Sequence, residues 1–192
     1  MRLILASASP RREQLLRQIG LNFEVIPSQV DETVPAEMSE NHGILVQGLA
    51  LKKAASVARH LSNGLVIGAD TIVVRNRDIL GKPTSRAEAV EMLERLSGQS
   101  HHVFTGIALV DAASGRCRKA FQQTEVFFRQ LSLAEIEAYV NTGEPMDKAG
   151  AYGIQGMGSL LIEKISGCYY NVVGLPLTKL AELLKEFGLW VL

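Results

Sequence analysis

Cysteine is scarce in this chain, with Cys117 and Cys168 as the only two in 192 residues. They do not form a CxxC pair, and the dense cysteine framework of small secreted proteins is missing. His101 and His102 lack HxxxH or cysteine spacing, which argues against a zinc site. We therefore expect a protein of a reducing compartment, without a disulfide.

Net charge is also lacking, because 20 lysines and arginines balance 20 aspartates and glutamates. No global electrostatic field would draw such a chain to nucleic acid or to an anionic membrane, so neither is expected as a partner. An anionic ligand would have to be held by local groups.

Long apolar runs are missing as well. No uninterrupted apolar stretch approaches the roughly 18 residues of a transmembrane helix. The opening MRLILASASPRR has too short an apolar core for a signal peptide. We therefore expect a soluble, cytoplasmic protein. What is present is a hydrophobic fraction of 47%, sufficient for one domain over residues 1–192 with room for two lobes.

The stretch 65–74, LVIGADTIVV, is a run of strand-forming residues with a carboxylate, Asp70, near its middle. An unpaired charge is costly to bury in a sheet, so Asp70 needs a cation, a hydrogen-bond network or a catalytic role. Taken alone, the pattern favours a turn or a helix cap at Asp70. Isolated charged residues at the ends of other predicted elements could instead converge on it.

The chain begins with a predicted strand, RLILA, and a tight loop that contains Ser7. A helix is predicted over 10–19, with Ser9 as its N-cap and a proline in its first position. Helix N-termini favour anions, so Ser7 and the first amides would face any ligand there. Arg11 and Arg12 oppose the helix dipole, and are either solvated surface residues or bidentate ligands of a phosphate.

Residues 22–28 alternate as a second strand, followed by an acidic loop that contains Glu32. The loop carboxylates are either solvated or ligands of a cation such as Mg²⁺. A long helix is predicted from a cap at Ser39 to about residue 61. Lys52 and Lys53 interrupt its apolar covering, so at least one must lie near the apolar face, snorkelling to water or reaching a ligand.

A tight hairpin turn and a return strand follow the central strand, ahead of Lys82. Because Lys82 lies between a glycine and a proline, it is more often a turn residue than a functional group. Ser85 and Ser132 each begin a capping box for a helix. A second hairpin is predicted with arms over 101–112 and 117–129.

The glycine-rich stretch 144–158 predicts no packed element, but a backbone that can lie close to a ligand, with Gln155 among its polar residues. Its apolar residues give it more anchoring than a flexible linker needs. A strand over 159–165 and a last amphipathic helix, opened by Leu175 or Pro176, complete the chain.

Seven motifs, taken in order, give the chain a resemblance to a known family. They are LILASASPRR at the start, VDET at 30–33, LALKKA at 49–54, IGADT at 67–71, GKP at 81–83, TGEPMDKAGAYGIQG at 142–156 and VVGLPL at 172–177. The set resembles the Maf family of nucleoside triphosphate pyrophosphatases and covers essentially the whole chain. An ordered set of this kind is more specific than any single glycine-rich loop.

The resemblance implies an α/β fold related to the inosine triphosphate pyrophosphatases. In that fold a mixed twisted sheet with flanking helices forms two lobes around a deep cleft. The resemblance also implies hydrolysis of a nucleoside triphosphate to the monophosphate and pyrophosphate. A divalent metal cation (Mg, Mn or Co) is implied as cofactor, and a homodimer as the assembly.

Carried over by position, the resemblance makes Asp70 the general base that activates water, and a ligand of the metal. Glu32 would help to hold the metal or polarise the water. The implied substrate ligands are Ser7, Arg12, Lys52 and Lys82. These roles agree with the residue types, because a triphosphate with its metal needs several cations nearby.

In the family that the sequence resembles, three positions distinguish subgroups that act on different nucleobases. The subgroup that acts on dTTP and UTP has Arg, Thr and Gln there, which match Arg11, Thr71 and Gln155. The subgroup that acts on 7-methyl-GTP has Trp, Gln and Glu instead. A glutamine can both donate to and accept from the edge of uracil or thymine, so the sequence predicts dTTP and UTP as substrates, in house-cleaning of the nucleotide pool.

Other readings of the same pocket stay open at this point. A nucleotide-binding regulator of cell division, acting at the septum without important catalysis, would need a similar site. A pyrophosphatase acting on 7-methyl-GTP, inosine triphosphate or another purine nucleotide would keep the reaction and change the base. Hydrolysis of dTTP in the presence of a divalent metal would distinguish an enzyme from a regulator that only binds nucleotides. Pyrophosphate release from a panel of nucleoside triphosphates would show which base is preferred.

Overall fold

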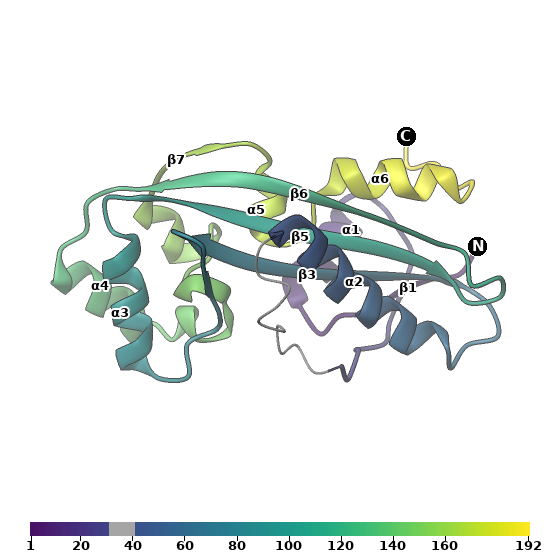
Figure 1. Ribbon diagram of the computed structural model, residues 1–192, viewed down its shortest axis with the longest axis horizontal. Helices are drawn as coiled ribbons and strands as arrows, with labels where there is room; N and C mark the ends of the chain where they lie inside the picture. The colour runs from purple at the N-terminus through teal and green to yellow at the C-terminus, as the bar shows by residue number, and fades with distance from the viewer. Residues whose placement is uncertain (31–40) are drawn as a thin grey trace. The chain divides into compact units, whose positions relative to one another are not determined.

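The computed structural model describes residues 1–30 and 41–192. Its strands form one mixed sheet in the order β2-β1-β3-β5-β6-β7, with β4 paired to β3 (Figure 1). The strands are β1 (Leu3–Leu5), β2 (Glu24–Val25), β3 (Leu65–Arg75), β4 (Asp78–Leu80), β5 (Ser100–Asp111), β6 (Cys117–Phe128) and β7 (Ile162–Ser166). β1 is parallel to both β2 and β3, whereas β4 and β7 run antiparallel to β3 and β6.

The helices of the described residues flank these strands. They are α1 (Pro10–Gln18), α2 (His42–Ala58), α3 (Arg86–Leu96), α4 (Leu133–Asn141), α5 (Tyr169–Val173) and α6 (Leu177–Glu186). Three 3₁₀ segments, η2 (Glu144–Asp147), η3 (Ala149–Ala151) and η4 (Gly156–Leu161), lie between α4 and β7. The predicted α/β class with a mixed sheet is therefore confirmed.

The chain divides into two compact units. The first comprises 1–70, 105–122 and 174–192, and the second comprises 71–104 and 123–173. β3, β5 and β6 each contribute residues to both units. The single domain and the deep cleft implied by the family resemblance stay predictions.

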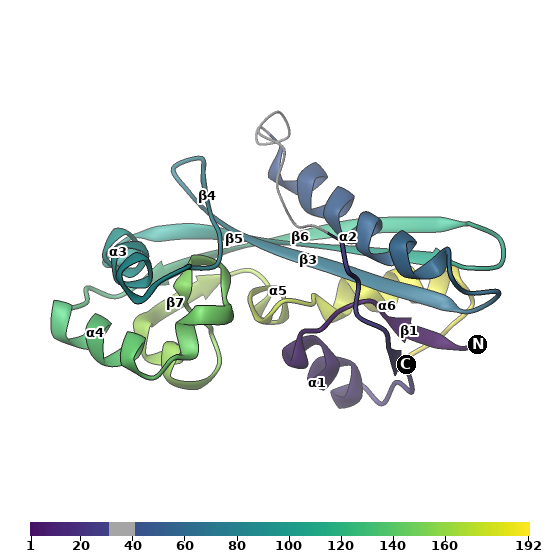
Figure 2. The same cartoon turned by 90° about the horizontal axis from the view of Figure 1, so that it is seen from below.

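In the first unit, α2 packs its buried face on the sheet. The core there joins Ala50, Ala54 and Val57 of α2 to strand residues such as Ile4 and Val66. Figure 2 shows α2 on one side of these strands and α1 on the other. Two glycines allow a close approach of α2. A Cβ on Gly68 would lie 2.2 Å from the carbonyl oxygen of Ala50, and a Cβ on Gly106 would lie 2.1 Å from that of Val46.

In the second unit, α3 and α4 pack against each other over a core that includes Leu93, Leu96, Phe128 and Tyr152. The start of α4 is fixed by a complete capping box between Ser132 and Glu135, as the sequence predicts.

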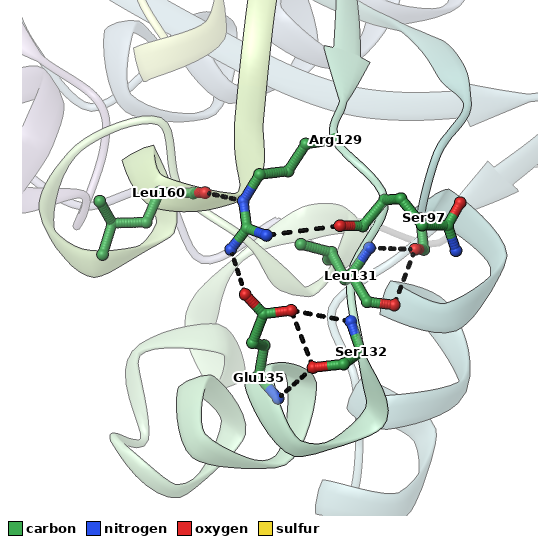
Figure 3. Close-up of polar contacts among 7 residues, drawn as sticks. Ser97, Arg129, Leu131, Ser132, Glu135 and Leu160 are labelled. Atoms are coloured by element: carbon green, nitrogen blue, oxygen red, sulfur yellow. Dashed lines mark hydrogen bonds and ion pairs between the residues drawn. The ribbon is translucent and has the colours of Figure 1, made fainter.

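Figure 3 shows how Arg129 extends this capping network. Its guanidinium donates to Glu135 Oε1 at 2.7 Å, and to the carbonyl oxygens of Leu160 at 2.6 Å and Gln130 at 3.3 Å. The Arg129 hydrogen bond, followed by those from Ser132, lowers the pKa of Glu135 to about 2. The end of β6, the start of α4 and the end of η4 are therefore tied together.

Most predicted elements are confirmed, including the central strand, both hairpins and the first helix. The tight turn at Asn76 and Arg77 has positive φ at both residues, as a type I′ hairpin turn requires. Cys117 and Cys168 are both free in this structure.

Several boundaries and caps were predicted wrongly. β2 covers only Glu24–Val25, and α2 begins at His42 with Asn41 as its cap in place of Ser39, ending at Ala58. Glu88 at the start of α3 accepts from Thr84 and not from the backbone of Ser85, so that capping box is half formed. β7 begins three residues later than expected, at Ile162, and α6 begins at Leu177 with Pro176 as its N-cap.

The glycine-rich stretch 144–158 is the largest correction, because it is packed. It folds into 3₁₀ turns whose buried residues include Pro145, Ala151 and Tyr152. Ala151 takes a positive φ of 59°, which costs on the order of 1 kcal/mol for a residue with a Cβ. α5 was also missed, since five residues that include an Asn and two β-branched residues give little helical signal.

Candidate functional site

Asp70 lies inside β3, which continues through it without a turn. The interpretation of Asp70 as a turn or cap residue is therefore wrong. Because side chains alternate along a strand, Asp70 shares a face with Val66 and Gly68, the face on which α2 packs. Only 7% of Asp70 is exposed, so its carboxylate needs a compensating cation.

Lys53 of α2 supplies that cation. Its Nζ donates to Asp70 Oδ1 in an ion pair, and the whole residue is only 6% exposed. Gly68 makes this contact possible, because α2 approaches β3 so closely that a Cβ on Gly68 would lie 2.8 Å from the backbone nitrogen of Ala54, the residue after Lys53. A buried carboxylate and a buried ammonium are thus brought together by the packing of α2 on the strand.

The sequence reasoning assigned Lys52 to the substrate and gave Lys53 no role. Its expectation that one of the two lysines lies on the apolar face is confirmed, and the lysine in question is Lys53. The signal was present in the helical spacing. Lys53 follows Leu49 and Ala50 by four and three residues and precedes Val57 by four, and all three are buried. Lys52 is exposed, and its role as a substrate ligand stays a prediction.

Arg12 and Ser7 form a second polar contact in the same unit. Arg12 is 9% exposed, so it is not a solvated surface residue. Its Nε donates to the carbonyl oxygen of Gly174 at 2.8 Å, and its NH1 group donates to Ser7 Oγ at 3.2 Å. Ser7 Oγ also accepts from the backbone N–H of Ser9 at 3.2 Å. The start of α1 therefore carries an oriented guanidinium beside a hydroxyl.

Gly174 is suited to its place because its φ is 122°, a conformation that residues with a Cβ rarely adopt. The glycine turns the chain between α5 and α6 and presents the carbonyl that Arg12 binds. Ser9 occupies the N-cap position of α1 as predicted, although its side chain makes no capping hydrogen bond. Arg11 is half-buried at the same helix start.

The remaining predicted site residues belong to the second unit. Thr71 is half-buried on β3, Lys82 is exposed after β4, and Gln155 is half-buried between η3 and η4. Glu32 lies outside the described residues. Ser7, Arg11, Arg12, Lys52 and Asp70 belong to the first unit.

The described residues offer no cluster of three or more His, Cys, Asp or Glu side chains that could hold a metal ion. Asp70 is a single buried carboxylate, a ligand type that suits Mg²⁺ or Mn²⁺ when substrate oxygens complete the shell. None of the helices in 1–30 and 41–192 combines the length and apolar character that a membrane span requires.

The family of this chain is decided by comparison with known proteins. A family model described as Maf-like protein matches residues 2–187. The chain belongs to the Maf family. Curated relatives within this Maf family share about half of the sequence. A dTTP/UTP pyrophosphatase from Desulforamulus reducens is 56% identical over 97% of this chain and 96% of its own length. A dTTP/UTP pyrophosphatase from Pelotomaculum thermopropionicum is 52% identical over 99% of this chain and 98% of its own length.

A solved structure supports the fold of this Maf protein. The HAM1 protein from Coxiella burnetii matches with a TM-score of 0.50 and 17% identity, over 84% of this chain and 80% of its own. At this identity the match concerns the fold alone, and it supports the predicted α/β architecture.

Proposed function

We propose that this Maf protein hydrolyses dTTP and UTP to the nucleoside monophosphate and pyrophosphate, as a house-cleaning enzyme of the nucleotide pool. The observation that carries the proposal is the name dTTP/UTP pyrophosphatase on relatives that are 56% and 52% identical over nearly their whole length. A homodimer and a cytoplasmic location are part of the same proposal.

Asp70 is the proposed general base. Lys53 engages Oδ1 of its carboxylate, so we assign proton acceptance to Oδ2. Asp70 takes a proton from a water that attacks the α-phosphorus in line, and pyrophosphate leaves. Burial of the Asp70–Lys53 pair supports this role, because the carboxylate is held in one place on a rigid strand.

The cationic residues bind the charge of the triphosphate. Arg12 is pre-oriented by Gly174 and Ser7, and an oriented guanidinium is well suited to two phosphate oxygens. Lys52 and Lys82 are the other proposed phosphate ligands, and Ser7 Oγ is a proposed donor to the same groups. The charges of Arg12 and the two lysines stabilise the transferring group and the leaving pyrophosphate.

A divalent cation fits the donor chemistry of the site. Asp70 would be its ligand among the described residues, with Glu32 proposed as a second and phosphate oxygens completing the shell. When bound, such a cation would neutralise phosphate charge and polarise the P–O bonds. Mg, Mn and Co are all compatible with oxygen ligands.

The proposed selection of the base depends on Arg11, Thr71 and Gln155. The amide of Gln155 can accept from the N3–H group of uracil or thymine and donate to an adjacent carbonyl. We expect Gln155→Glu to weaken turnover of UTP and dTTP selectively, since a carboxylate loses the donor. The kcat/KM for each of UTP, dTTP, CTP and GTP, measured by pyrophosphate release, tests this.

The expected result is a wild-type preference for dTTP and UTP that falls about tenfold or more in Gln155→Glu. An unchanged order of nucleotides in that variant would contradict the specificity assignment. A wild-type protein that releases no pyrophosphate from any nucleotide would overturn the enzymatic function itself.

A further inference from the structure

The segment Gly153–Gly158, here called the Gln155 loop, closes on itself. A Cβ on Gly158 would lie 2.2 Å from the carbonyl oxygen of Gly153, so the two ends of the loop are in direct backbone contact. Gln155 lies between these ends and is half-buried. The position of its amide therefore depends on whatever holds the two ends.

Glu144 holds the far end of the loop. Its carboxylate accepts from the backbone N–H of Met157 and from that of Gly158, both at 3.1 Å. It also accepts from the hydroxyl of Tyr139 at 3.0 Å. One carboxylate thus receives three donors, two of which are main-chain groups of the loop.

Tyr139 holds the near end. Its hydroxyl accepts from the backbone N–H of Gly153 at 3.2 Å while donating to Glu144. The ring is buried, with 5% of the residue exposed. Burial, reinforced by the nearby charge of Glu144, raises the pKa of the Tyr139 hydroxyl, so the hydroxyl stays protonated well beyond neutral pH.

Lys148 packs on the same loop. A Cβ on Gly153 would lie 2.8 Å from Lys148 Cε, so the lysine stem packs directly on the loop backbone. Its Nζ donates to the carbonyl oxygen of Glu144 at 2.5 Å and to Asp147 Oδ1 at 2.6 Å. The groups that hold the loop are therefore linked to one another, and all of them lie in the second unit.

We propose that Glu144 and Tyr139 are positioning residues that fix the Gln155 loop and so set the nucleobase preference of the enzyme. The inference rests on the proposed function, because it explains how Gln155, the proposed base-selecting residue, is held in place. A base-reading amide must be held to within about 0.5 Å to discriminate by hydrogen bonding. A glutamine amide exchanges donor and acceptor when it flips, so an unsupported Gln155 would also accept cytosine.

The test compares kcat/KM for UTP and CTP in three variants. Glu144→Gln keeps the side-chain shape but offers only one acceptor oxygen, and its NH₂ group would face a loop N–H. Tyr139→Phe keeps the buried ring and removes only the hydroxyl. Glu88→Gln is the matched control, since the Glu88 carboxylate lies in the same unit, accepts from Thr84 at the start of α3, and makes no hydrogen bond to the Gln155 loop.

We expect the UTP/CTP ratio of kcat/KM to fall about tenfold in Glu144→Gln and by a smaller factor in Tyr139→Phe. The change should come mostly from a higher KM for UTP, with kcat within about threefold of wild type. Glu88→Gln should keep the wild-type ratio. Hydrogen exchange at the N–H groups of Met157 and Gly158 should be faster in Glu144→Gln and unchanged in Glu88→Gln.

A wild-type UTP/CTP ratio in both Glu144→Gln and Tyr139→Phe would overturn the inference and leave the proposed function intact. Tyr139→Phe keeps the test decisive if Glu144→Gln does not fold. A wild-type enzyme with no preference between UTP and CTP would instead overturn the proposed specificity, and the inference with it.

Discussion

At the scale of single residues, the charge at Asp70 is balanced by a lysine that the sequence reasoning passed over. The side chains of Lys53 and Asp70 are 8% and 10% exposed, so little water screens the pair. Removing one partner of a buried ion pair leaves the other charge uncompensated, which typically costs about 3–5 kcal/mol.

Lys53→Met should therefore lower the free energy of unfolding by about 3–5 kcal/mol, measured by urea denaturation. Lys52→Met is the matched substitution at the neighbouring, exposed position and should cost clearly less. Equal losses in the two variants would contradict the assignment of Lys53 as the partner of Asp70.

His101 makes the stability of the second unit depend on pH. It is 1% exposed, its Nε2 lies 2.7 Å from the hydroxyl of Tyr152, and its ring makes edge contacts with Phe128 and Tyr152. Burial, followed by the charges of His102 and Arg75, lowers the pKa of His101 from 6.5 to about 3. The folded protein therefore holds His101 neutral over a range in which the unfolded chain protonates it.

Because the pKa of His101 is lower in the folded state, the stability that neutral His101 contributes is fully present above pH 6.5. This contribution is lost as the pH falls toward 3. Between pH 6.5 and pH 4 the loss from His101 should be roughly 3 kcal/mol. His101→Gln should flatten the pH dependence of the unfolding free energy over this range. A variant whose pH dependence parallels that of wild type would show that another group is responsible.

Residue-level prediction succeeded where a side chain had a chemical reason to stand out. Asp70 is conspicuous as a carboxylate in an apolar strand, and its burial follows from that pattern. Glu144 was not singled out, because a glutamate beside a proline in a glycine-rich stretch resembles a solvated surface residue. Its role depends on backbone N–H groups thirteen and fourteen residues later, which no local pattern indicates.

At the scale of elements, the site is built by α2 lying directly on β3 and β5. Gly68 and Gly106 leave room for the helix backbone, and this close approach brings Lys53 to Asp70. A capping residue and a run of apolar residues predicted α2, but the closeness of its contact with the strands depends on two glycines whose role is visible only in the folded structure.

Gly68→Ala should separate α2 from β3, because the new Cβ would lie 2.2 Å from a helix carbonyl oxygen. We expect a loss of about 2–3 kcal/mol in the free energy of unfolding, as for overpacking in a core. Gly48→Ala is the control, since a Cβ there meets nothing within 4 Å, and it should be neutral or stabilising by up to about 1 kcal/mol. Thermal or urea unfolding of both variants decides between these outcomes.

Caps and short elements were the least predictable features. Asn41 caps α2 within two residues of the predicted Ser39, and both residue types are good N-caps, so local preference alone does not choose between them. The turns over 144–158 are packed because Tyr139, Glu144 and the core around Tyr152 hold them, and these contacts come from outside each turn.

At the scale of the whole molecule, the order of motifs along the chain predicted the family and the mixed α/β sheet, and both are confirmed. That success came from motifs spread over the whole chain, since composition alone indicates only a self-sufficient core. The family resemblance implied two lobes, but the sharing of β3, β5 and β6 between the two units could not be predicted, because strand pairing is set by long-range contacts.

The central claim is that Asp70 is the base of a pyrophosphatase that acts on dTTP and UTP. Asp70→Asn keeps the size of the side chain and removes its ability to accept the proton. The decisive measurement is pyrophosphate release from dTTP with a divalent cation, alongside the binding affinity for dTTP. We predict that Asp70→Asn binds dTTP with near wild-type affinity and loses at least about 100-fold in kcat. Near-normal pyrophosphate release by Asp70→Asn would contradict the account.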